Sequence, residues 1–170
     1  MKIKISFFVV MALILTLCSC QRSLLSPRTA ALAMAEACED RAAGSVYTTE
    51  SSYGAPDHLS TELMAELFGD FDFTGVNGAV YLSGATSLFE LSFFDCPDTD
   101  TAEAVGGLCA ARFDLASKTA KRMGLDESDF TVKIYGRRVL AAMCEESERA
   151  VSAGLEKIKG QKSLFNMKKG

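Results

Sequence analysis

The chain has 170 residues, and its 22 acidic and 18 basic side chains give a formal net charge of −4. This acidic balance argues against nucleic-acid binding, because affinity for nucleic acid comes from the neutralisation of phosphates by Lys and Arg. The sequence also lacks the glycine-rich loops that bind the phosphates of nucleotides. Its length suits one globular domain. The composition therefore favours a single acidic domain with no nucleic-acid partner.

The N-terminal segment has the parts of a secretory signal peptide. Lys2 and Lys4 supply a basic start, and residues 5–17 form an apolar run interrupted only by one Ser and one Thr. A signal peptide needs an apolar run of about 7–15 residues and a small residue at the cleavage point. A membrane-spanning helix needs about 20 apolar residues, so this run is too short to cross a bilayer. We therefore expect residues 1–19 to be removed during export.

Leu17-Cys18-Ser19-Cys20 resembles the bacterial lipobox, in which an aliphatic residue and a small residue precede a cysteine. The resemblance implies that the Cys20 thiol takes a diacylglyceryl group, that the chain is cut before Cys20, and that the new N-terminus is acylated. Cys18 is the rival acceptor, but it would place the bulky Leu17 at the cleavage point. The other interpretation is a signal peptide with two incidental cysteines. Because two or three acyl chains anchor a protein stably, we expect a lipid anchor on the extracytoplasmic face of the cell membrane.

Two short helices are predicted after this segment. Residues 20–28 form a short tether. Small apolar residues then recur at helical spacing over residues 31–42, which predicts the first helix. Residues 44–56 are polar and turn-rich, so we expect a loop there. Asp57 is a suitable N-cap for the second helix, which Gly69 ends.

Strand patterns begin at residue 76. Residues 76–82 and 88–95 flank a glycine-containing turn and predict a hairpin. In the second of these segments, apolar side chains alternate with Glu90 and Ser92, which is typical of a half-buried strand. Asp100, followed three residues later by a glutamate, is the expected N-cap of a long helix.

A second hairpin and a last helix complete the pattern. The long helix is expected to end at about Met123, since Gly124 follows it. Residues 130–135 and 138–144 predict the hairpin, and residues 145–159 predict the final helix. We predict an α+β fold with the order ββαββα. It has an antiparallel sheet of about four strands, helices packed on one face, and the two short helices before it.

The two halves of this domain repeat weakly. Each half runs strand, turn, strand, cysteine, acidic stretch and helix, so Cys96 and Cys144 occupy matching places. We place the single α+β domain at residues 29–160. Residues 161–170 are expected to form a basic, flexible tail, which is the usual state of an exposed terminus.

This organisation resembles a family of small lipoproteins from clostridia and their relatives that carry a single domain of unknown function. Besides the lipobox, the resemblance lies in residues 80–82, residues 91–94, Arg112 and the closing hairpin from Val132 to Ala142. It covers most of the mature chain. The resemblance implies a cell-surface lipoprotein and nothing about catalysis.

Four cysteines remain after the lipobox, at positions 38, 96, 109 and 144. An exported chain permits disulfides, and four cysteines allow three pairings. The matching positions of Cys96 and Cys144 favour a bond between these two. Cys38 and Cys109 lie on apolar helix faces, where cysteine is often a small buried hydrophobe. No Cys-x-x-Cys spacing occurs and His58 is the single histidine, so we expect no metal, no cofactor and no Cys–His nucleophile.

Carboxylates gather at two places in the sequence. Asp70 and Asp72 precede a strand, and Asp95, Asp98 and Asp100 precede the long helix. Paired acids can hydrolyse a glycan or bind calcium. The second group lacks the glycine and the distal glutamate of a calcium loop. Acids at a turn and at a helix N-terminus complement the helix dipole, so we favour structural roles.

Arg112 lies at the edge of the core face of the long helix. It is a candidate cation for a ligand, but a snorkelling or ion-paired arginine is commoner. The basic residues from Lys157 to Lys169 are candidates for contact with anionic lipid headgroups, or simply form a solvated terminus.

Three hypotheses of function follow. We favour a non-enzymatic lipoprotein whose domain binds or scaffolds an envelope protein or a small ligand. The alternative is an envelope hydrolase that uses Asp70 with Asp72, or the acids from Asp95 to Asp100. It requires two acids close together in a pocket, one of them with a raised pKa. A protein-interaction module would instead show an exposed apolar patch.

Overall fold

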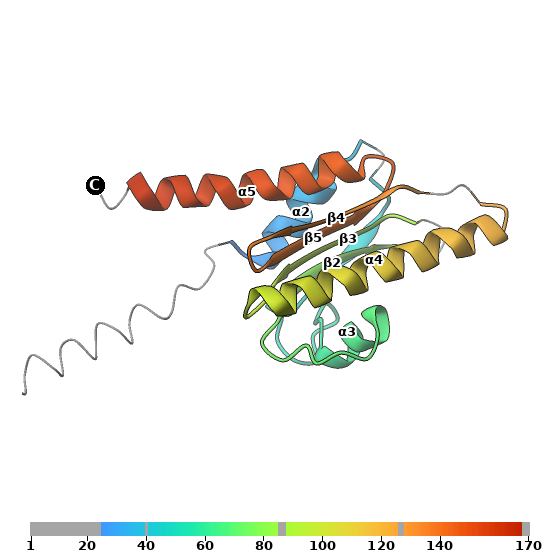
Figure 1. Cartoon of the computed structure of the whole chain (residues 1–170), viewed down its shortest axis with the longest axis horizontal. Coiled ribbons are helices and arrows are strands. Elements are labelled where there is room, and N and C mark those ends of the chain that lie inside the picture. The colour runs from blue at the N-terminus through green and yellow to red at the C-terminus, as the bar shows by residue number, and fades with distance from the viewer. Residues whose placement is uncertain (1–24, 40, 85–87, 126–127, 168–170) are drawn as a thin grey trace, which may run out of the picture.

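A computed structural model of the chain describes residues 25–39, 41–84, 88–125 and 128–167 (Figure 1). The expected signal peptide, the lipobox and the last three residues lie outside these ranges. The described elements follow the order α2 (Pro27–Glu36), β1 (Gly44–Thr48), α3 (Thr61–Phe68), β2 (Asn77–Ser83), β3 (Glu90–Asp95), α4 (Thr99–Arg122), β4 (Phe130–Tyr135), β5 (Arg138–Met143) and α5 (Ser147–Met167).

The strands form one antiparallel sheet in the order β1-β2-β3-β5-β4. Both predicted hairpins are present, β2 with β3 and β4 with β5. The hairpins meet through β3 and β5, whose pairs run from Glu90 opposite Met143 to Asp95 opposite Arg138. These elements confirm the predicted α+β fold, with a ββαββα order preceded by two short helices.

A fifth strand, β1, lies where the sequence predicts a loop. It pairs with β2 from Gly44 opposite Ser83 to Thr48 opposite Ala79. The strand packs closely, since a Cβ atom at Gly44 would lie 2.3 Å from the Leu82 carbonyl oxygen. Val46, Tyr47 and Thr48 favour a strand, but the polar, turn-rich residues that follow them predict a loop, and pairing with β2 completes the strand.

Helices cover both faces of the sheet, whereas the sequence predicts them on one (Figure 1). The face with Leu91, Phe93 and Leu140 packs against α2 and α5, and the face with Val80 and Phe94 packs against α3 and α4. The reason lies in the central strands, because all six residues of β3 are buried. A strand that is apolar on both sides needs cover on both sides.

Two helices begin at caps other than those predicted. Asp98, and not Asp100, caps α4, and its Oδ1 accepts the Thr101 N–H at 2.7 Å. Likewise Ser60, and not Asp57, caps α3. Both true caps have an extended backbone, which lets the side chain reach a free N–H three residues ahead.

The ends of the domain also differ from the predicted boundaries. Ser26 caps α2 with Pro27 at its first turn, and Leu25 is already part of the core with 2% exposure. At the other end, α5 continues to Met167, past the predicted end at residue 159, and no proline interrupts it. In the described part of the chain, no helix combines the length and the apolar character that a membrane crossing requires.

Candidate functional site

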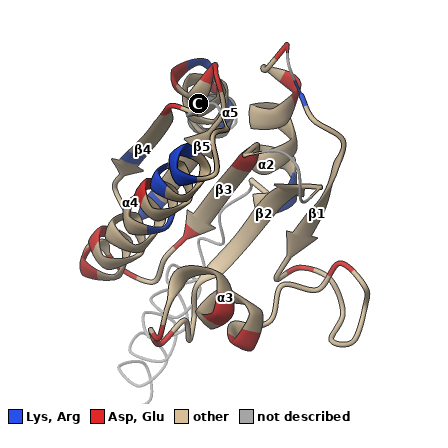
Figure 2. Ribbon diagram, turned by 90° about the vertical axis from the view of Figure 1, so that its right-hand side faces the viewer, with Lys and Arg blue, Asp and Glu red and all other residues tan. Residues whose placement is uncertain are grey.

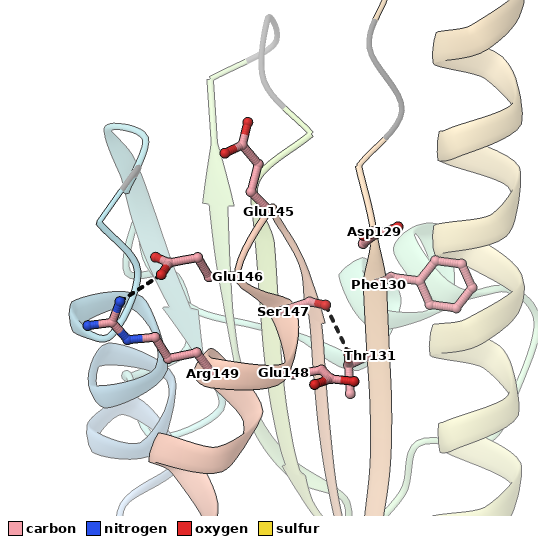
Figure 3. A pocket seen from close by; sticks show the side chains of 8 residues that line it. All are labelled: Asp129, Phe130, Thr131, Glu145, Glu146, Ser147, Glu148 and Arg149. Carbon is pink, nitrogen blue, oxygen red and sulfur yellow. Dashed lines mark hydrogen bonds and ion pairs between the residues drawn. The ribbon is translucent and has the colours of Figure 1, made fainter.

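A polar depression lies where the β4–β5 hairpin meets the start of α5 (Figure 3). Its lining comes from residues 129–131, at the start of β4, and from residues 145–149, which lead from β5 into α5. Asp129 and the three glutamates in this lining make it acidic, and Arg149 is its one base. The depression is open to solvent. It therefore offers an acidic surface and not an enclosed ligand cavity.

Hydrogen bonds within the protein engage the polar groups of this depression. Glu146 accepts the Glu39 N–H and the Arg149 Nη1, both at 2.6 Å. The Ser147 and Thr131 hydroxyls lie 2.9 Å apart. Figure 3 shows this contact and the Glu146–Arg149 contact as dashed lines. The Glu39 N–H, and then Arg149, lower the pKa of Glu146. A carboxyl group with a lowered pKa stays ionised at neutral pH, so it is unsuited to general-acid catalysis.

Arg112, the predicted ligand candidate, is engaged inside the fold. Its Nε lies 2.8 and 3.0 Å from the two Glu90 carboxylate oxygens, and its Nη2 lies 2.7 Å from Glu90 Oε2. Its Nη1 donates to the Leu67 carbonyl at 2.9 Å, and its guanidinium carbon lies 5.6 Å from the centre of the Phe68 ring. The ion-paired interpretation of Arg112 is therefore confirmed, and each of its three nitrogen atoms already contacts Glu90 or the Leu67 carbonyl.

Asp70 and Asp72 do not converge on a cavity. Both are exposed on the segment between α3 and β2. Asp72 Oδ1 accepts the Thr74 N–H at 2.9 Å, and the side chain and backbone of Thr74 lower the pKa of Asp72. This is the ordinary behaviour of an aspartate that closes a turn through its own side chain.

The three acids that the sequence predicts near the start of the long helix have three separate environments. Asp95 is buried, and its Oδ1 lies 3.2 Å from Arg137 Nε and 3.8 Å from Arg138 Nε. Asp98 caps α4, and the Thr101 N–H is the main cause that lowers the pKa of Asp98. Asp100 is exposed in the first helical turn. Figure 2 shows the acidic residues of the described chain spread over several elements.

The strand register separates Cys96 from Cys144, the two cysteines between which the sequence favours a bond. The Cys96 N–H donates to the Arg137 carbonyl at one end of the β3–β5 ladder, and Cys144 follows Met143 at the other end. The two side chains also belong to cores on opposite faces of the sheet. A Cys96–Cys144 disulfide is incompatible with this register. Each cysteine follows the C-terminal end of its strand, and in an antiparallel pair these two ends lie at opposite ends of the ladder. Cys144 lies instead beside Cys38.

His58 has a structural contact. Its Nδ1 lies 2.8 Å from the Ser51 carbonyl oxygen, and its ring meets the Tyr53 ring edge-on. Among the described residues, no group of three or more His, Cys, Asp or Glu side chains is arranged to hold a metal ion.

Two features of this region escape sequence reasoning. Glu90 is an acid at the start of a mostly apolar strand, and the alternation pattern predicts that this position is exposed, whereas Glu90 is buried. The contacts of Glu39 with Glu146 and Arg149 span 107 and 110 positions, and no local pattern reveals them. Comparisons with models of protein families, with curated proteins and with solved structures find no match for this chain.

Proposed function

We propose that this chain is a lipoprotein, held on the extracytoplasmic face of the cell membrane by acyl chains on Cys20, whose domain binds or scaffolds a partner at the cell envelope. The observation that carries the proposal is the succession of basic start, apolar run and lipobox in residues 1–20. The resemblance to small clostridial lipoproteins supports the same assignment.

The start of the folded domain suits such an anchor. Leu25 is buried in the core, and α2 begins at Pro27. An extended chain covers at most about 3.6 Å per residue, so the segment from Cys20 to Leu25 reaches about 18 Å at most. A lipid on Cys20 would therefore keep the domain next to the membrane surface.

The arrangement of the acids supports a non-catalytic domain. A hydrolase with paired carboxylates needs two neighbouring acids, one with a raised pKa. Asp72 and Asp98 have lowered pKa values and bind backbone N–H groups, while Asp95 lies beside arginines. The hydrolase alternative is accordingly the weaker candidate.

Exposed apolar side chains on the α4–β4 side support a protein partner over a small ligand. Met123 and Leu125 lie at the end of α4, and Phe130 and Ile134 lie on β4. Their exposed fractions range from 38 to 70%. β4 is also an edge strand, with backbone groups available for a partner. These side chains and the β4 edge offer a protein partner apolar and backbone groups to contact.

Palmitate labelling and the intact mass of membrane-extracted protein test the anchor. The wild type and the Cys18→Ala control should carry lipid, and Cys20→Ala should lose it. Lipid retained in Cys20→Ala but lost in Cys18→Ala would move the anchor by two residues. A mature wild-type protein without lipid would reject the lipoprotein assignment.

A photo-cross-linking residue placed at Ile134 in living cells tests the interaction surface. We expect one discrete cross-linked species from this position. Tyr53, an aromatic side chain with 90% exposure in the segment between β1 and α3, is the matched control and should give none. Equal cross-linking from both positions would contradict a specific partner on the α4–β4 side.

A further inference from the structure

Two cysteine side chains from distant parts of the chain meet in the core that α2 and α5 cover. Cys38 follows α2 and Cys144 follows β5, and their sulfur atoms lie 3.7 Å apart across 106 positions of sequence. Both side chains are buried, with 6% and 2% exposure. The two sulfur atoms are thus already in contact, as a disulfide requires of its partners.

A second set of contacts holds the same two segments together. The Glu39 N–H donates to Glu146 Oε2 at 2.6 Å. Arg149 Nη1 lies 3.0 Å from Glu39 Oε1 and 2.6 Å from Glu146 Oε1. Figure 3 shows the Arg149–Glu146 part of this clamp. Because Glu39 follows Cys38 and the other two residues follow Cys144 closely, the clamp fixes the backbone next to each sulfur atom.

We propose that Cys38 and Cys144 form a disulfide that joins the end of α2 to the segment between β5 and α5. The oxidant is an organic disulfide, either a small molecule or the active-site disulfide of a thiol oxidoreductase. One cysteine thiolate attacks this disulfide, which forms a mixed disulfide and releases the first thiol. The second cysteine thiolate then attacks the protein sulfur of the mixed disulfide and releases the second thiol. Two protein thiols are oxidised, one external disulfide is reduced, and the two protons end on the released thiols.

The bond requires little movement of the protein. The sulfur atoms of a disulfide lie about 2.05 Å apart, so the two side chains must close a gap of less than about 2 Å. The bond would close a loop between two residues that lie 106 positions apart. A cross-link that closes so long a loop reduces the conformational entropy of the unfolded chain, and it should therefore stabilise the folded state.

The other two cysteines serve as internal controls. Cys96 and Cys109 both lie in the core under α3 and α4. Burial raises the pKa of the Cys96 thiol to about 12 and also raises the pKa of Cys109. Cys96 and Cys109 also lie on the opposite face of the sheet from Cys38 and Cys144, so the fold keeps them away from this bond.

The geometry of the Cys38–Cys144 pair does not depend on the lipid anchor. Only its oxidation in the cell rests on the proposed function, because disulfides persist in exported proteins and are reduced in the cytosol. The test is therefore made on purified protein, and lipid is measured separately.

Full-length protein, purified in detergent with reductant, is transferred to oxidised glutathione, alkylated and digested with trypsin for mass spectrometry. Cys38 and Cys144 fall in peptides 29–41 and 139–149, whereas Cys96 and Cys109 share peptide 42–112. We expect peptides 29–41 and 139–149 to be joined. Cys38→Ser should abolish this species, and Cys96→Ser should retain it.

Peptide 42–112 joined to peptide 139–149 would overturn the proposal, and so would cysteines that end only as mixed disulfides with glutathione. The oxidised wild type should also lose roughly 10 °C of melting temperature on reduction. The melting temperature of Cys38→Ser should not change when reductant is added. A linked protein without lipid would reject the anchor and keep the disulfide, and a lipidated protein without the link would reject the disulfide alone.

Discussion

The carboxylate of Glu90 holds the guanidinium of Arg112 inside the fold through three nitrogen–oxygen contacts of 2.7 to 3.0 Å. Glu90 belongs to β3, Arg112 belongs to α4, and the Arg112 contact with the Leu67 carbonyl adds α3. Burial by itself lowers the pKa of Arg112, but the hydrogen bonds and charge of Glu90 outweigh this effect, so the pKa of Arg112 is raised above its ordinary value. Arg112 therefore stays protonated, and the pair connects two helices to the sheet.

Removal of one partner of this pair should cost more stability than removal of both. Arg112→Ala leaves the 6%-exposed Glu90 without its cation and should cost about 3–5 kcal/mol. The double variant Glu90→Leu/Arg112→Met removes the buried Glu90 charge together with its half-buried partner and should recover most of that loss. Urea unfolding measures both. Lys118→Ala, which breaks an exposed pair with Asp114 on the same helix, is the control and should cost less than about 1 kcal/mol. Equal losses of unfolding free energy for Arg112→Ala and Lys118→Ala would show that the Glu90–Arg112 pair contributes no more stability than an exposed pair.

The cap at Asp98 predicts a dependence on pH. The Thr101 N–H holds the pKa of Asp98 below its ordinary value of 3.8. The ionised cap therefore stabilises the fold at every pH above the unfolded pKa, and this contribution is lost as the pH falls through the lower folded pKa. Asp98→Ala should melt below the wild type at pH 7, and the difference should narrow as the pH falls below about 4.

Two further substitutions make the cap test specific. Asp98→Asn keeps an oxygen acceptor for the N–H and should melt close to the wild type at pH 7. Asp100→Ala changes an exposed acid of the same turn that does not cap the helix, and it should also melt close to the wild type. A larger loss of melting temperature from Asp100→Ala than from Asp98→Ala would show that Asp100 caps the helix, as the sequence predicts.

Local patterns were sufficient to predict most of the fold. Alternating apolar residues and turn glycines located both hairpins, because a hairpin is built from neighbouring residues. The long helix was placed within a few residues at each end, and Gly124 follows it with a φ of +72°. Glycine adopts this conformation without the strain that a side chain brings.

Contacts between distant segments account for what the sequence could not predict. β1 is a strand because it pairs with β2, whereas the polar, turn-rich residues that follow it favour a loop in the sequence pattern. Glu90 occupies a position that alternation predicts to be exposed, and only the approach of Arg112 makes its burial tolerable. The contact of Cys144 with Cys38 follows from the strand register and from the packing of α2. The single sequence specifies neither of these locally.

The packing of α5 against α2 and the sheet predicts that glycine is favoured over alanine at position 154. A Cβ atom there would lie 2.6 Å from Leu140 Cδ2 and 2.9 Å from Met34 Cγ. Gly154→Ala should therefore cost about 1–3 kcal/mol through overpacking. Gly107→Ala on α4, where a Cβ atom would meet nothing within 4 Å, is the matched control. It should gain up to about 1 kcal/mol from helix propensity. Thermal unfolding of both variants measures the contrast, and a stabilised Gly154→Ala would show that α5 sits farther from the sheet.

The clamp between Glu39 and Glu146 should be visible in the titration of one amide proton. The Glu39 N–H donates to Glu146 Oε2, and this bond, together with Arg149, lowers the pKa of Glu146 from its ordinary value of 4.5. The charge-assisted bond is therefore complete above about pH 4.5 and is lost as the pH falls through the lower folded pKa of Glu146. In NMR spectra, the Glu39 amide proton should move upfield across that acidic range. Glu146→Gln should remove this step, since an amide does not titrate, and Glu145→Gln should keep it because Glu145 points away from Arg149 (Figure 3). If the step survives in Glu146→Gln, another acid is its source, and the end of α2 is held by something other than this carboxylate.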